Sequence, residues 1–266
     1  MDKGKLVSQI EKNTTWLAKN LFFYEETGST NDDIKKMANE SAQDGTLVVA
    51  DTQTAGRGRR GRIWISPKGE SIYMSLLLRP KCIPNQASAL TLVMALAVTE
   101  AMEELVPGKS GIKWPNDIVM NGKKVCGILT EMNLEQNTID YVVIGVGINV
   151  NQSLFDEEIA ITATSIALEL GEKIDRTELI GRILYYFEQE YAEFEKTYDL
   201  TNHAERYNQY LLNKDRQVCV LDPKGDYKGL ALGINPQGEL LVKCQNGEIA
   251  EVYAGEVSVR GVYGYV

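Results

Sequence analysis

The chain has 266 residues, a formal net charge of −9 and 44% hydrophobic residues, a composition typical of a globular protein with one large and one small domain. It contains no apolar run close to the ~20 residues that cross a bilayer, so no membrane partner is expected. The first residues are polar, which predicts a cytoplasmic rather than a secreted protein, and the acidic balance argues against nucleic acid as a partner.

Hydrophobic periodicity divides the chain into residues 1–20, 21–212 and 213–266. The first part is a linker-like segment with apolar residues at loosely helical spacing. The second alternates strands with helices, and Ser29 or Thr30 and Asp175 are expected to cap two of its helices. Extended segments are predicted at 22–24, 47–50, 72–78, 111–115, 117–120, 125–132 and 141–150. Helices are predicted at 29–41 and 86–105 and after residue 175. The segment 141–150 is apolar on both faces and is therefore expected at the centre of a sheet.

The third part has a different pattern of predicted elements. After about residue 213, short strands follow one another at intervals of about ten residues, separated by turns such as Gln245-Asn-Gly-Glu248. This spacing, without a helix, predicts a small β-barrel of SH3-like size.

Cysteine and histidine usage excludes several kinds of chemistry. The cysteines stand without a C-x-x-C pair, which argues against a zinc site or a disulfide framework and favours reduced, mostly buried thiols. The single histidine, His203, lies in a polar segment and is predicted at the surface. Chemistry is therefore expected to use lysine, arginine, carboxylates, backbone amides and a bound cation. The cysteines are Cys82, Cys126, Cys219 and Cys244.

The segment Gly56-Arg-Gly-Arg-Arg-Gly-Arg62 places four guanidinium groups among three glycines in an acidic chain. Glycine lets the backbone approach a ligand closely, and arginine offers planar donors that match carboxylate and phosphate. The glycine spacing also matches a dinucleotide-binding fingerprint, but turn and strand follow it where that fingerprint needs a helix. A loop that binds an anion is the favoured interpretation.

Three further motifs accompany this arginine loop. Lys113-Trp-Pro-Asn-Asp117 sets charged and polar side chains at a strand end, and Lys123-Lys-Val-Cys-Gly127 places lysines at a strand entrance. Gly145-Val-Gly-Ile-Asn149 embeds glycines in a central strand, where they weaken the sheet unless something packs on the backbone. Together they indicate a flat ligand lying on the sheet.

These four motifs, in this order, resemble those of the biotin–protein ligases, and the resemblance extends from Phe22 to Gly261. It implies an α+β fold, with a mixed central sheet flanked by helices as in class II synthetases and an SH3-like C-terminal barrel. It also implies that biotin and ATP form biotinyl-5′-adenylate, from which biotin passes to a lysine of a biotin carboxyl carrier domain. Mg²⁺ is expected mainly with ATP, and no protein-built metal site is predicted.

The resemblance also assigns roles to individual residues. Lys124, Arg59 and Asp117 are expected to be catalytic. For biotin, the implied contacts are Ser29, Thr30, Asn31, Gln53, Gly56, Arg57, Lys124, Gly127, Leu129 and Gly147. For ATP and the adenylate, they are Arg57, Arg59, Arg62, Trp64, Lys113, Asn116, Lys124 and Asn149.

Two other functions stay open at this point. A lipoate–protein ligase resembles the same core but lacks this arginine loop in its usual form. Repressor members of the family carry an N-terminal winged helix-turn-helix, for which residues 1–20 are too short. The chain is therefore a ligase without that domain or the core of a biotin-sensing repressor, with no DNA binding expected from these residues and a homodimer possible.

Overall fold

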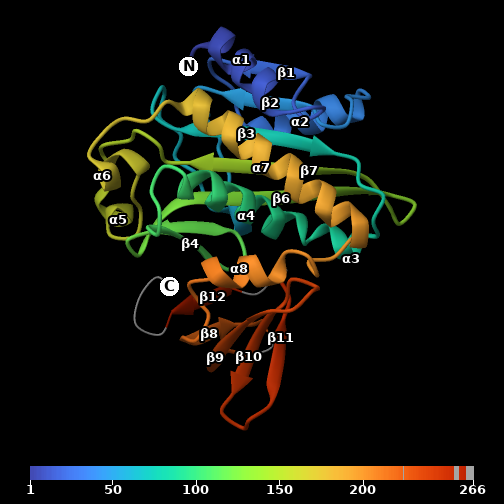
Figure 1. Cartoon of the computed structure of the whole chain (residues 1–266), viewed down its shortest axis with the longest axis vertical. Coiled ribbons are helices and arrows are strands. Elements are labelled where there is room, and N and C mark those ends of the chain that lie inside the picture. Colours follow the sequence, from blue (N-terminus) through green and yellow to red (C-terminus); the bar gives the residue numbers. More distant parts are fainter. Residues whose placement is uncertain (224, 255–257, 262–266) are drawn as a thin grey trace.

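A seven-stranded mixed sheet and a five-stranded antiparallel sheet organise the computed structural model, which describes residues 1–223, 225–254 and 258–261 (Figure 1). The strand order of the larger sheet is β1-β2-β3-β7-β6-β5-β4, in which β1 and β2 pair in parallel and the other neighbours pair antiparallel. Its strands are β1 (Leu21–Tyr24), β2 (Leu47–Ala50), β3 (Ile72–Leu78), β4 (Ser110–Lys113), β5 (Asp117–Met120), β6 (Lys123–Glu135) and β7 (Thr138–Ile148). The predicted mixed sheet with a central 141–150 strand is confirmed.

Helices cover both faces of this sheet. On one face, α4 and α7 pack against each other over a continuous apolar core, and α1 packs on α7. On the other face, Ile34 and Ala38 of α2 pack on Val48 and Leu77. The helices are α1 (Lys3–Asn13), α2 (Thr30–Asn39), α3 (Pro84–Ala87), α4 (Leu90–Glu103), α5 (Glu157–Ala160), α6 (Ile166–Leu170), α7 (Arg176–Thr197) and α8 (Ala204–Tyr210), with a 3₁₀ turn η1 (Arg59–Gly61). None of the described helices combines the length and the apolar character that crossing a membrane requires.

Local sequence explains these helices, with two corrections. Asp175 accepts a hydrogen bond from the Thr177 amide at 2.9 Å, so the predicted cap of α7 is confirmed. Ser29 occupies the N-cap position of α2, but its side chain makes no capping hydrogen bond, so the predicted role of its hydroxyl as a cap is wrong. The helix predicted at 86–105 is divided into α3 and α4, because residues around Ser88 and Ala89 form bonds of the i to i−3 kind.

The smaller sheet lies below the larger one in Figure 1, with α8 between them. Its strand order is β11-β10-β9-β8-β12, so β11 and β12 are its two edges among the described residues, and a closed SH3-like barrel is not confirmed. Trp114 joins the two sheets: its indole N–H donates to the Gly238 carbonyl at 3.0 Å. The strands are β8 (Gln217–Leu221), β9 (Tyr227–Ile234), β10 (Leu240–Cys244), β11 (Ile249–Val252) and β12 (Ser258–Gly261).

The single histidine does not lie at the surface. His203 is only 1% exposed, and its Nε2 lies 2.9 Å from the Glu190 carbonyl oxygen. The prediction was wrong because the His203 ring turns inward against Glu190 of α7, while its neighbours Thr201, Asn202 and Glu205 are exposed. The four cysteines are free; Cys82 and Cys126 are buried, and the other two are half-buried.

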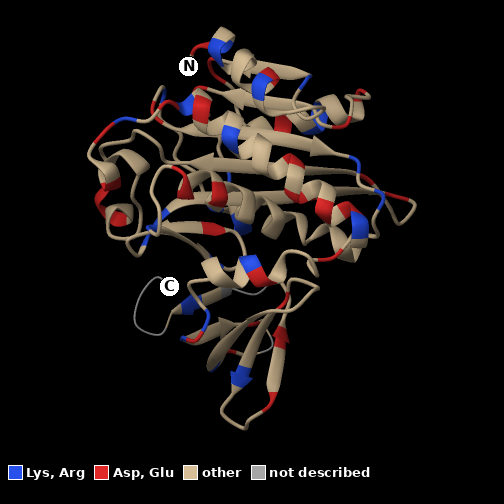
Figure 2. Cartoon of the chain, viewed as in Figure 1, with Lys and Arg blue, Asp and Glu red and all other residues tan. Residues whose placement is uncertain are grey.

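Acidic residues are spread along α5 and α7 (Figure 2). Where three helices meet, the half-buried Glu100 and the buried Glu190 share one arginine. Arg206 on α8 donates to Glu100 on α4 at 2.9 Å and to Glu190 on α7 at 2.6 Å. Burial, together with the charge of Glu190, raises the pKa of Glu100 to about 7, although Arg206 acts in the opposite direction.

We expect the Glu100→Gln variant to be more stable than the unaltered protein at pH 8, and equally stable at pH 5. The folded pKa of Glu100 lies above the ordinary value of 4.5, so between these two values the folded state binds more protons and the free energy of unfolding falls as pH rises. The stabilisation at pH 8 is expected to be ~1–3 kcal/mol. Urea unfolding at both pH values measures it, with Glu158→Gln on the exposed surface of α5 as a control. An equal effect of Glu100→Gln at both pH values would contradict this assignment.

Candidate functional site

Strand register brings the separate sequence motifs together. Directly paired residues of neighbouring strands point to the same face of a sheet. Here one transverse row crosses five strands on the α2 face, through both glycine motifs and into the lysine–aspartate motif. The row consists of Tyr73, Gly147, Gly127, Asp117 and Lys113. The second and third residues of the row, Gly147 and Gly127, have no side chains and form a strip of bare backbone, here called the glycine strip. The row then ends in the charged side chains of Asp117 and Lys113.

A β-bulge directs Lys124 toward this row. The register between β5 and β6 shifts so that Ile118 pairs with Cys126 while Val119 pairs with Lys124. Regular alternation from Gly127 would place Lys124 on the opposite face of the sheet, and the extra residue Val125 returns Lys124 to the face of Gly127 and Asp117. As a result, the Lys124 Nζ lies 2.6 Å from the Asp117 Oδ1. The bulge thus places an ammonium group beside the glycine strip.

The arginine loop folds as a narrow hairpin over the strip. Gly58 and Trp64 donate their amides to Arg62 and Gly56 at 2.8 and 2.9 Å, and Arg60 takes a left-handed φ of 59° at the tip. A Cβ at Gly56 would lie 2.6 Å from the Trp64 carbonyl oxygen, so only glycine fits at the base of the hairpin.

Trp64 closes the hairpin onto the sheet. A Cβ at Gly127 or Gly147 would lie 2.9 or 2.6 Å from the Trp64 indole, so both glycines admit the ring. The Lys124 Nζ lies 5.3 Å from the centroid of this ring, within range of a cation–π interaction. Among the described residues, the buried indole N–H has no hydrogen-bond partner.

Arg59 connects the hairpin with both sheets. Its guanidinium donates to the Asn116 Oδ1 at 2.8 Å and to the Ala254 carbonyl at 2.9 Å. Burial lowers the pKa of Arg59, and the neighbouring arginines add to this effect while Asp117 opposes it. Burial also lowers the pKa of Lys113 to about 8, again against the effect of Asp117. The site therefore concentrates positive charge at its β5–β6 end.

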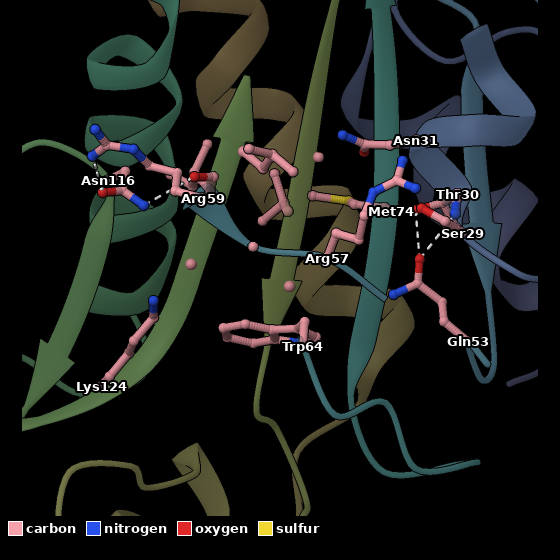
Figure 3. A pocket seen from close by; sticks show the side chains of 17 residues that line it. Ser29, Thr30, Asn31, Gln53, Arg57, Arg59, Trp64, Met74, Asn116 and Lys124 are labelled. Carbon is pink, nitrogen blue, oxygen red and sulfur yellow. Dashed lines mark hydrogen bonds between the residues drawn. The ribbon is translucent and has the colours of Figure 1, made fainter. Parts of the chain in front are cut away.

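The opposite end of the site carries neutral polar side chains, together with Arg57, whose guanidinium pairs with Asp32 on α2. Thr30, at the first turn of α2, donates its amide to the Gln53 Oε1 at 2.9 Å. Ser29 and Asn31 flank it and are buried. Figure 3 shows Ser29, Thr30 and Gln53 at one side of the cavity and Arg59, Asn116 and Lys124 at the other, with Trp64 between them.

A cavity of about 50 Å³ joins the two ends. Most of the site residues expected from the sequence line it, and so do five residues that were not expected: Gly58, Met74, Ile128, Gly145 and Val146. Strand alternation and register identify these additions only once the sheet is known. The expected residues that line it are Ser29, Thr30, Asn31, Gln53, Arg57, Arg59, Trp64, Asn116, Lys124, Gly127, Leu129 and Gly147.

Five expected residues lie outside the lining. Gly56 supports the hairpin, and Arg62 is exposed on it. Asp117 and Lys113 follow Gly127 in the transverse row, on β5 and β4. Asn149 is buried and donates its amide to the Thr164 carbonyl at 3.0 Å, which ties the segment after β7 to the sheet. The expected contact of Asn149 with adenine stays a prediction.

Comparison with known proteins agrees with this geometry. Residues 24–149 match the model of the biotin/lipoate A/B protein ligase family, and residues 215–260 match the biotin protein ligase C-terminal domain. The bifunctional ligase/repressor BirA of Bacillus subtilis is 40% identical over 248 residues, which are 92% of this chain and 76% of that protein. The biotin–[acetyl-CoA-carboxylase] ligase of Mycobacterium tuberculosis is 36% identical, with 87% of this chain and 86% of that protein covered.

A solved structure extends the similarity to the fold. The biotin protein ligase from Aquifex aeolicus in complex with biotin and ATP is 34% identical, with a TM-score of 0.79 over 91% of this chain and 99% of that one. Fold and site thus define an enzyme core with a cavity beside an arginine-rich hairpin. The chain belongs to the biotin protein ligase family.

We expect Gly147→Ala to displace Trp64 and open the arginine hairpin without unfolding the protein, since the new Cβ would lie 2.6 Å from the indole. Limited trypsin digestion reports this, as faster cleavage within residues 57–62. Gly58→Ala is the control, because a Cβ there meets no atom closer than 3.8 Å. Equal cleavage of the two variants would show that the indole does not depend on the glycine strip.

Proposed function

We propose that this protein is an ATP-dependent biotin–protein ligase that forms biotinyl-5′-AMP and then transfers biotin to a lysine of a biotin carboxyl carrier domain. The observation that carries the proposal is a cavity with neutral hydrogen-bonding groups at Ser29, Thr30 and Gln53 on one side and the cations Arg59 and Lys124 on the other. Biotin has the matching polarity, with a neutral ureido ring at one end and a carboxylate at the other.

The first step brings two anions together. A carboxylate oxygen of biotin forms a bond to the α-phosphorus of ATP, and the bond from that phosphorus to the β-phosphate oxygen breaks, so pyrophosphate leaves. Cations at the reacting centre lower the repulsion and stabilise the leaving charge. Lys124 and Arg59 supply those charges, and Asp117 holds the Lys124 ammonium at 2.6 Å. Positioning and electrostatics therefore account for this step without a histidine.

In the second step, a lysine amine attacks the acyl carbon of the adenylate, AMP leaves, and the amine proton passes to a base. Asp117 is the carboxylate of the transverse row and is our candidate for orienting that amine. Lys113, Asn116 and Arg62 lie on the same side and would contact the nucleotide phosphates. Trp64 would pack over the adenylate, with its partnerless indole N–H available to it.

Magnesium fits this site as a companion of the nucleotide. Among the described residues, no cluster of three metal-binding side chains occurs. Mg²⁺ commonly binds through one or two carboxylates together with substrate phosphates, and Asp117 offers one such carboxylate. The ion would neutralise phosphate charge when bound.

The remaining proposals concern context. The acceptor is a biotin carboxyl carrier domain of a carboxylase, the protein acts in the cytoplasm, and a homodimer is possible. The domains are 1–20, 21–212 and 213–266, the last as an SH3-like barrel. These proposals rest on the family and on the sequence patterns described above.

ATP-dependent transfer of biotin to a purified carrier domain tests the function directly. Parallel reactions with lipoate, and an operator-binding measurement, separate the ligase from a lipoate ligase and from a repressor core. Transfer of lipoate alone, or no transfer of biotin, would overturn the proposal.

Lys124→Ala is expected to lower the rate of adenylate formation by about 10²- to 10³-fold, because the reacting centre loses a charge. Pyrophosphate release with biotin and ATP measures it. Lys123→Ala is the matched control: its side chain donates to the Ala160 carbonyl at 3.0 Å and does not line the cavity. A rate for Lys124→Ala close to that of the control would remove Lys124 from the reaction centre.

Arg59→Gly is expected to release the adenylate early, because the hairpin loses both its bond to Asn116 and its bond to Ala254. Biotin should then label lysines of unrelated proteins, detected with a streptavidin blot of serum albumin. Arg60→Gly is the control, since Arg60 is exposed and its φ of 59° suits glycine. Unchanged selectivity of Arg59→Gly would show that the two bonds do not retain the adenylate.

A further inference from the structure

A chain of hydrogen bonds leads from the partly exposed Glu131 on β6, through buried side chains, to the Thr30 end of the cavity. The Asn31 Nδ2 donates to the Glu131 Oε2 at 2.7 Å, and the Ser75 hydroxyl lies 2.5 Å from the Asn31 Oδ1. The Ser75 and Thr30 hydroxyls lie 2.7 Å apart. Ser75 is completely buried on β3, does not line the cavity, and has no role in the reaction described above.

The packing leaves little freedom in this chain. Ser75 pairs with Gly145 across β3 and β7, and a Cβ at Gly145 would lie 2.2 Å from the Asn31 Oδ1. Gly145 therefore makes room for the Asn31 amide over the sheet. The chain is a built feature, held by α2 and three neighbouring strands.

The end groups fix the direction of every hydrogen bond. The Glu131 carboxylate also contacts the Lys35 ammonium at 2.5 Å, and a carboxylate accepts hydrogen bonds without donating any. Asn31 must therefore turn its NH₂ group to Glu131 and its oxygen to Ser75. The Asn31 oxygen can only accept a hydrogen bond, so the Ser75 hydroxyl donates its single proton to that oxygen.

Thr30 must then supply the proton for its contact with Ser75. Its hydroxyl also lies 3.1 Å from the Gln53 Oε1, which accepts the Thr30 amide at 2.9 Å and has a second lone pair. Two hydroxyl oxygens as close as those of Ser75 and Thr30 need a proton between them, however, and the Ser75 proton is already on the Asn31 side. The shorter contact, 2.7 Å to Ser75, takes the proton. The lone pairs of the Thr30 oxygen are left for the cavity.

The Gln53 amide is oriented in the same way from the other side. The Ser66 hydroxyl lies 3.0 Å from the Trp64 carbonyl, which can only accept, so Ser66 donates to it. Ser66 then accepts from the Gln53 Nε2 at 3.1 Å, and the Gln53 oxygen faces Thr30. The orientations of the Asn31 and Gln53 side-chain amides are thus fixed by the Glu131 carboxylate and the Trp64 carbonyl, which can only accept hydrogen bonds.

We propose that Glu131 and Ser75 are positioning residues that make the Thr30 oxygen an obligate hydrogen-bond acceptor, and that this selects a ligand with an N–H at that end. The inference rests on the proposed function, in which the ligand is biotin and the N–H belongs to its ureido ring. A ligand oxygen at the same place would face the Thr30 lone pairs and be rejected, since neither oxygen has a proton to share.

Two cyclic carbamate analogues of biotin test this, each with one ureido N–H replaced by oxygen. We expect the unaltered protein to bind one of them at least about 100-fold more weakly than biotin, by isothermal titration. Binding of both analogues within threefold of biotin would overturn the inference.

Glu131→Gln should reduce that discrimination at least about tenfold. The new amide can donate to the Asn31 oxygen, after which Asn31 donates to Ser75, Ser75 donates to Thr30, and the Thr30 proton is free to face the cavity. Glu135→Gln, on the exposed end of the same strand, makes the same charge change outside the chain and should keep the discrimination. Lys35→Met should keep it as well, because the Glu131 carboxylate remains.

Ser75→Ala provides an independent variant, because it frees the Thr30 proton without touching the surface charge, and it should also reduce the discrimination. Thermal unfolding checks that each variant is folded. A ratio unchanged in both Glu131→Gln and Ser75→Ala would overturn the inference while leaving biotin transfer by the unaltered protein intact. If the unaltered protein transfers no biotin, the proposed function itself is wrong, and the inference falls with it.

Discussion

The site depends on a close approach that only bare backbone allows. Gly127 and Gly147 are directly paired on adjacent strands, so two neighbouring positions on one face of the sheet have no side chain. The Trp64 indole occupies that space, and with it the arginine hairpin is fixed over the cavity. Glycine normally weakens a strand, and here the loss is offset because an aromatic ring packs on the exposed backbone. The other contacts of the hairpin, such as those of Arg59, depend on this packing of Trp64 against the sheet.

The two ends of the cavity on either side of Trp64 carry different kinds of groups. Lys124 lies between Asp117 and the Trp64 ring, so its ammonium is restrained from two sides. At the far end, the hydrogen-bonded chain of Ser75, Asn31 and Thr30 presents fixed dipoles rather than charges. On the proposed function, a cavity built in this way distinguishes the two ends of biotin before any reaction takes place. Preorganised groups of this kind cost little reorganisation when charge develops.

The C-terminal sheet contributes to the same site through backbone rather than side chains. Its Ala254 carbonyl accepts from Arg59, while its Gly238 carbonyl accepts from Trp114. Trp114 lies in the same motif as Asn116, which is the other acceptor for Arg59. The small sheet is therefore coupled to the hairpin at both ends of one short segment, and a shift of that sheet would move the Arg59 guanidinium.

The sequence by itself determined the elements and the chemical inventory: an arginine loop between strands, glycines in a central strand, a capped α7 and a cavity rich in cations but without histidine. These are local or periodic properties, so residue order suffices to predict them. Tertiary structure decided where the side chains point. The bulge at Val125 turned Lys124 to the catalytic face, register aligned Gly127 with Asp117, and the buried Ser75–Asn31–Glu131 chain arose from residues far apart in sequence. The burial of His203 and the bond of Asn149 to Thr164 were equally invisible, because both depend on which segment packs against which. A single inserted residue in a strand changes the face of every side chain beyond it, and no pattern of residue types announces that shift.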